Sequence, residues 1–150
     1  MIIDNMQVKG RLGIVLKDKN GNVKETREVD NLVVTAGLEY IASRMVDADA
    51  AVISHMGLGD SSIAANAAQT DLQSLVGSRA ALASTTLNGT AVAYVADFGA
   101  GDSTGAITEA GLFNASTGGT MLCRTVFDVV NKSADDSLSI TWTVTIAAAS

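Results

Sequence analysis

The chain has no proline among its 150 residues, one cysteine, Cys123, and one histidine, His55. Without proline, glycine, asparagine and aspartate must shape the loops, and no slow prolyl isomerisation limits folding. A single cysteine rules out an internal disulfide, and these two residues cannot supply a multi-histidine or cysteine-cluster metal site. We therefore expect no metal or other cofactor, and we interpret His55 as a structural residue.

Aromatic residues and positive charge are also scarce. Aromatics make up 4% of the chain, and the net charge is −6 with a pI near 4.5. Small side chains suit strands packed closely together better than a deep ligand cavity. An acidic chain lacks the electrostatic footprint of a nucleic-acid-binding protein, so no nucleic-acid partner is expected.

Long hydrophobic runs are missing as well. No apolar stretch reaches the length that crosses a membrane, and Asp4 interrupts the apolar start that a signal peptide would need. The expectation is a protein made in a cytoplasm, with no membrane partner.

Residues 1–30 are predicted to form an N-terminal β-hairpin. Apolar and polar residues alternate over residues 6–16, Asn20-Gly21 favours a tight turn, and residues 23–29 form a charged return strand typical of a sheet edge. The first 44 residues hold seven of the ten basic residues. They suggest an arm that binds acidic partners, although a hairpin that only covers the sandwich edge fits equally well. The candidate partner-binding residues are Lys9, Arg11, Lys17, Lys19, Lys24 and Arg27.

One helix is predicted, over residues 35–47. Thr35 is placed to cap it, and an apolar stripe at helical spacing indicates a face packed on a sheet. The stripe consists of Leu38, Ile41, Ala42 and Met45.

Residues 107–127 are predicted to form two strands joined by a turn at Gly118-Gly119, where positive φ angles are available. Glu109 lies among small and apolar residues, so its carboxylate needs a partner if it is buried. Arg124 and Lys132 are the candidates, with Arg124 preferred. The structural interpretation competes with a catalytic one, which lacks an accompanying acid or histidine.

The last strand, residues 138–146, alternates most regularly. Trp142 and its apolar neighbours at even positions are predicted to form the core against Leu112, Phe113 and Phe127. The threonines at odd positions indicate a face turned to solvent or to a wet interface with a partner.

These elements predict a mainly β protein with one domain. Eight or nine short strands with frequent turn signals indicate a β-sandwich over residues 31–150, with a jelly roll as one form it can take.

A resemblance extends over most of residues 31–146. It is carried by Glu109-Ala-Gly-Leu-Phe113, Gly118-Gly-Thr-Met-Leu-Cys-Arg124, Phe127, Lys132 and Trp142, together with Asn31–Gly37, Ile53–Gly59 and Thr70–Leu72. This pattern resembles small virion structural proteins of tailed bacteriophages, which are head-decoration or tail-fibre-associated β-domain proteins.

The resemblance implies a non-enzymatic decoration or cement protein that binds the major capsid protein and copies of itself, as a dimer or trimer, in a virion assembled in the host cytoplasm. The alternative is a fibre, collar or baseplate component that binds tail proteins. A third hypothesis is a small enzyme or a carbohydrate-binding module. Its sign would be one cleft holding Glu109, Asp97 and Asp128.

Overall fold

Two antiparallel five-stranded sheets form the body of the protein. The computed structural model describes residues 6–46 and 50–148. Sheet A has the strand order β2-β1-β10-β7-β6, and sheet B has the order β3-β9-β8-β4-β5. The elements are β1 (Met6–Lys17), β2 (Val23–Asp30), β3 (Leu32–Val33), α1 (Thr35–Arg44), β4 (His55–Gly59), β5 (Ala80–Ala81), β6 (Ser84–Asn88), β7 (Ala91–Phe98), β8 (Gly105–Phe113), β9 (Met121–Lys132) and β10 (Ser137–Ala148).

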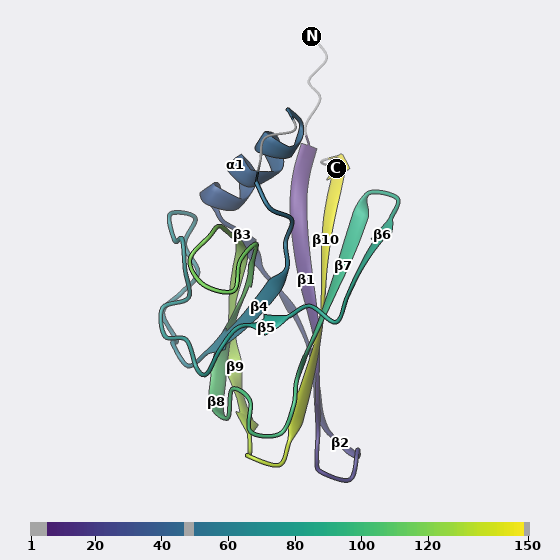
Figure 1. Ribbon diagram of the computed structural model, residues 1–150, viewed down its shortest axis with the longest axis vertical. Coiled ribbons are helices and arrows are strands. Elements are labelled where there is room, and N and C mark those ends of the chain that lie inside the picture. Colours follow the sequence, from purple (N-terminus) through teal and green to yellow (C-terminus); the bar gives the residue numbers. More distant parts are fainter. Residues whose placement is uncertain (1–5, 47–49, 149–150) are drawn as a thin grey trace.

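The predicted single-domain β-sandwich is confirmed, and Figure 1 shows the two layers with α1 at the end where the described chain begins and finishes. The predicted turns are present at Asn20-Gly21, Asn88-Gly89 and Gly118-Gly119. Strands consecutive in sequence pair within one sheet at β1–β2, β4–β5, β6–β7 and β8–β9. Hairpins within each sheet, rather than two Greek keys, therefore dominate the strand order.

The N-terminal hairpin is part of the sandwich. The charged strand β2 is an edge, as predicted, but β1 lies inside sheet A and pairs with β10 from Met6 to Lys17. Leu12, Ile14 and Leu16 of β1 are at most 2% exposed in the core. The described residues 6–30 therefore belong to the sandwich and do not form a hairpin outside it, because alternate side chains of β1 complete the hydrophobic core.

The core between the sheets contains Trp142, which is fully buried with Leu112 and Phe127 in the same cluster. Leu138, Ile140 and Val144 join it as predicted, whereas Ile146 is half-buried. Phe113 is a correction. It packs in a second cluster with Val34, Leu72 and Met121. Successive side chains of a strand point to opposite faces, so an inward Leu112 sends Phe113 outward.

The predicted helix is shorter and packs differently. It spans Thr35–Arg44, and the predicted residue 47 lies outside the described residues. The residue before it, Val34, occupies the cap position without a side-chain hydrogen bond, so Thr35 is not the cap. Leu38 and Met45 are 47% and 81% exposed and Ala42 is exposed, so the predicted core stripe is wrong at these three positions, whereas Ile41 packs against the main core as predicted. The helix instead approaches β9 through Gly37, where a Cβ atom would collide with the Leu122 carbonyl.

The outer faces of the two sheets differ. On sheet B, the chain between β4 and β5 crosses the outer face, where Leu72 packs with Phe113 and the Arg79 guanidinium carbon lies 3.5 Å from the centre of the Phe113 ring. On sheet A, no element of the described chain packs over Thr141, which is exposed, or over Thr143 and Thr145, which are half-buried. Sheet A therefore presents one face to its surroundings. Among the described residues, no helix has the length and apolarity needed to cross a membrane.

Candidate functional site

Glu109 and Arg124 form a buried ion pair on the outer face of sheet B. Arg124 Nε donates to Glu109 Oε1 at 3.0 Å, and both side chains are 0% exposed. The pairing of β8 with β9 sets this contact, because Gly111 opposes Arg124 and Glu109 opposes Val126. The predicted pairing of Glu109 with Arg124 is present. The alternative partner, Lys132, instead donates to the Gly99 carbonyl at 2.8 Å.

Backbone groups of the covering segment occupy the rest of the Glu109 carboxylate. The amides of Gln73 and Ser74 donate to it at 3.0 and 2.8 Å, and the Ser61 amide donates at 3.3 Å. A carboxylate that accepts an arginine and three amides has little capacity left for a substrate. It fastens the segment between β4 and β5 to sheet B.

The close packing around the Glu109 carboxylate requires a glycine at position 59. Gly59 lies beside the carboxylate, and a Cβ atom at that position would collide with Glu109 Oε2. On the arginine, Nη1 donates to Gln69 Oε1 at 3.0 Å, while Nη2 has no hydrogen-bond partner among the described residues. Sequence periodicity gave no signal for Gln69, Gln73 or Ser74, because these residues lie in an irregular segment.

Three of the six predicted partner-binding residues contact the chain itself. Arg11 pairs with Glu28 at 2.6 Å, and Lys24 pairs with Asp136 at 2.8 Å. Arg27 donates to Glu25 and to the carbonyls of Asp128 and Val129 on β9. The hairpin is thereby tied to the body. The other three are exposed and form no ion pair among the described residues: Lys9, Lys17 and Lys19.

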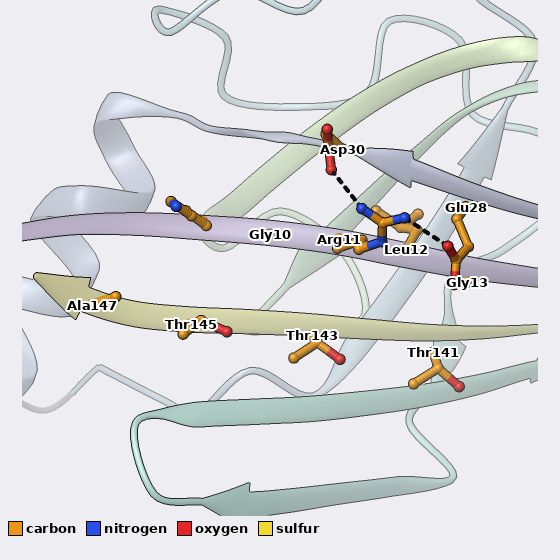
Figure 2. A pocket seen from close by; sticks show the side chains of 11 residues that line it. Gly10, Arg11, Leu12, Gly13, Glu28, Asp30, Thr141, Thr143, Thr145 and Ala147 are labelled. Atoms are coloured by element: carbon orange, nitrogen blue, oxygen red, sulfur yellow. Dashed lines mark hydrogen bonds and ion pairs between the residues drawn. The ribbon is translucent and has the colours of Figure 1, made fainter. Parts of the chain in front are cut away.

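The bare face of sheet A carries an open groove with a volume of about 650 Å³. Its floor is formed by Gly13, Thr141 and Thr143, and Figure 2 shows Arg11 at its wall between Glu28 and Asp30. Arg11 Nη1 lies 3.6 Å from Asp30 Oδ1. Hydroxyl and methyl groups with one charged corner suit a protein surface better than a small charged substrate.

The carboxylates named for an enzymatic site do not converge. Glu109 is buried in its ion pair, whereas Asp97 and Asp128 are exposed, on β7 and β9 respectively. Asp97 lines a shallow cavity with Val15 and Lys17 that contains neither of the other two. Among residues 6–46 and 50–148, no group of three acidic, histidine or cysteine residues is placed to hold a metal ion.

Cys123 is an inert core residue. It is fully buried in β9, and burial raises the pKa of its thiol well above the usual value. The thiolate is the reactive form of cysteine, so the thiol is protected at neutral pH.

Comparisons with protein-family models, with curated proteins and with solved structures find no match to this chain.

Proposed function

We propose that this protein is a non-enzymatic structural component of a tailed-bacteriophage virion, and that it decorates and cements the capsid. It binds neighbouring copies of the major capsid protein and buries surface at their junctions. Repetition over a symmetric shell multiplies modest contacts into strong overall attachment.

The observation that supports this role most is that the charged residues of the pattern that resembles virion proteins are buried. Glu109 and Arg124 are 0% exposed and paired with each other, and Lys132 is 1% exposed. Trp142 is 0% exposed in the core. Residues that only hold a β-sandwich together fit a structural module, because a catalytic group must reach its substrate.

The bare face of sheet A is the surface that we assign to the capsid. Lys9, Arg11 and Lys17 occupy odd-numbered positions of β1, on the face opposite the buried Leu12, Ile14 and Leu16, and all three are exposed. In the β1–β10 pairing, Lys9 and Arg11 lie opposite Thr145 and Thr143, and Lys17 lies opposite Ser137. Lys9 and Lys17, which form no ion pair among the described residues, would meet acidic groups of a polar surface, and these contacts would weaken as salt concentration rises.

The test uses virions of the phage that encodes the chain and particles prepared without this protein. Quantitative mass spectrometry should find hundreds of copies per virion. Purified protein added back should bind at similar occupancy and raise the temperature at which the particles release DNA. Between a few and a few dozen copies would instead indicate a tail component, and absence from the virion would overturn the proposal.

A matched pair of variants tests the assigned face. Thr141→Lys places a long charged side chain on the bare face, whereas Thr117→Lys makes the same change in the exposed turn between β8 and β9 of sheet B. We expect the first variant to lose particle binding and the second to retain it. Equal binding by both would remove sheet A from the interface.

A further inference from the structure

The two edges of sheet A have opposite chemistry. β2 forms one edge, and five of its eight residues are charged. β6 forms the other edge, and none of its residues, Ser-Thr-Thr-Leu-Asn, is charged. The charge-free stretch extends from residue 80 to residue 96, between Arg79 and Asp97. Charge on an edge strand prevents unwanted pairing, so β2 is protected in a way that β6 is not.

β6 is also accessible on both of its faces. All five residues are exposed, although alternate side chains of a strand point to opposite sides. Figure 1 shows the β6–β7 hairpin at the margin of the sheet, on the opposite side from β2. Within the part of the chain that the structure describes, β6 pairs only with β7. Half of its backbone N–H and C=O groups therefore point away from the sheet without a strand to receive them.

We propose that β6 is a self-association edge, which pairs antiparallel with β6 of a second copy about a two-fold axis at Thr86. In this register Thr86 faces Thr86 of the other copy, Ser84 faces Asn88, and Thr85 faces Leu87. Sheet A of one copy and sheet A of the other, with five strands each, then become one continuous sheet. The bare faces of the two copies lie side by side on the same surface of this sheet. A two-fold interface of this kind uses the same patch on both copies.

The distribution of charge indicates that the partner of β6 is a second copy of this chain. The chain has a net charge of −6, with ten acidic and three basic residues after residue 44. Two copies therefore repel each other over most of their surfaces, and the uncharged hairpin is where they approach with the smallest penalty. A basic partner would instead favour acidic residues on the edge, and an acidic partner would favour basic ones.

Apolar contact favours the same register. Leu87 is 74% exposed at the end of β6. When Thr85 and Leu87 face each other across the axis, the two leucines become diagonal neighbours about 7–8 Å apart, within reach of long side chains. Main-chain hydrogen bonds then supply the pairing, as in other strand additions.

Disulfide trapping tests the register in the intact chain. Thr86→Cys places two cysteines opposite each other at a Cα separation of about 4.5–5.5 Å, which a disulfide spans. Mild oxidation should convert this variant to a covalent dimer. Ser84→Cys is the matched control, because four residues of offset place its two cysteines about 13 Å apart. A mixture of Ser84→Cys with Asn88→Cys should cross-link again. Cys123 is buried and should not contribute.

Sedimentation velocity over a concentration series gives a second measurement without new cysteines. The unmodified protein should dimerise, Thr86→Lys should weaken dimerisation by at least about tenfold because like charges then face each other, and Thr26→Lys on β2 should leave it unchanged. A monomeric parent protein, equal cross-linking of Thr86→Cys and Ser84→Cys, or a dimer that tolerates Thr86→Lys would each overturn the proposal. These outcomes are independent of the virion role, because every measurement uses the purified protein alone.

Discussion

The outer faces of the two sheets show how burial changes the contribution of an arginine–carboxylate pair to stability. Each face carries an arginine–carboxylate contact of similar length, 3.0 Å for Arg124–Glu109 and 2.6 Å for Arg11–Glu28. The first pair is 0% exposed under the covering segment, whereas the side chains of the second are 60% and 69% exposed. Solvent screens the exposed pair, while the buried pair cannot lose one partner without stranding a charge. The distance between the charged groups therefore does not determine which pair contributes more to stability.

The largest expected effect comes from the interior that both sheets share. Trp142→Ala removes the largest fully buried side chain, so we expect a loss of about 3–5 kcal/mol in the free energy of unfolding. Chemical denaturation followed by circular dichroism measures it. Phe113→Ala, in the separate cluster outside sheet B, is the comparison, and the two losses should be nearly additive. A Trp142→Ala variant as stable as its parent would contradict the assigned core.

Glu109→Gln tests the buried pair directly. The change leaves the Arg124 guanidinium buried beside a neutral amide, and we expect a loss of about 3–5 kcal/mol in unfolding free energy. The control is Glu28→Gln, which makes the same change on the exposed face and should leave the denaturation midpoint unchanged. Similar losses in both variants would show that covering the strand surface does not set the difference.

The pair of Lys24 with Asp136 is intermediate in burial, with side chains 41% and 5% exposed, and its contribution can be tested by changing the pH. Lys24 and the Ser133 amide donate to Asp136, and these hydrogen bonds lower the pKa of its carboxyl group. A carboxyl whose pKa is lower in the folded state stabilises the protein above its unfolded pKa of about 4, and this contribution is lost as pH falls through the folded pKa. As the pH falls below about 4, the parent should therefore lose more stability than Asp136→Asn. Parallel stability curves for the two proteins would rule out the linkage.

The smallest effect is expected on the bare face. Thr141→Lys adds an exposed side chain where no element covers the sheet, so the unfolding free energy should change by at most about 0.5 kcal/mol. Thermal denaturation measures the change. A large loss would mean that this face is packed in the folded protein, and would make the same variant unsuitable for testing particle binding.

Sequence periodicity predicted most of the sandwich because each long strand has one buried face. The alternation of residues 138–146 identified Trp142 as core, and the Asn-Gly pairs located two hairpin turns. The order of the strands could not be predicted, because alternation carries no information about which strands are neighbours. The same limit made β1 look like part of an arm, although it pairs with β10.

The helix and the site show where local patterns mislead. An apolar stripe predicted that Leu38 and Met45 were buried, but close approach at Gly37 turned a different face toward β9. The partner of Glu109 was predictable, because a buried carboxylate requires a cation. The three amides that also bind it come from an irregular segment. Their positions depend on the tertiary fold, which no spacing rule describes.

The burial of Trp142 also provides an optical reporter. It is the only tryptophan in the chain, it is fully shielded from solvent, and it lies on β10, two strands away from β6 in sheet A. Its fluorescence should therefore be blue-shifted and resistant to aqueous quenchers in the folded protein. Pairing through β6 should leave the emission maximum unchanged, whereas opening of the sandwich should shift it to the red. A single spectrum thus distinguishes a protein that has changed its association from one that has lost its fold.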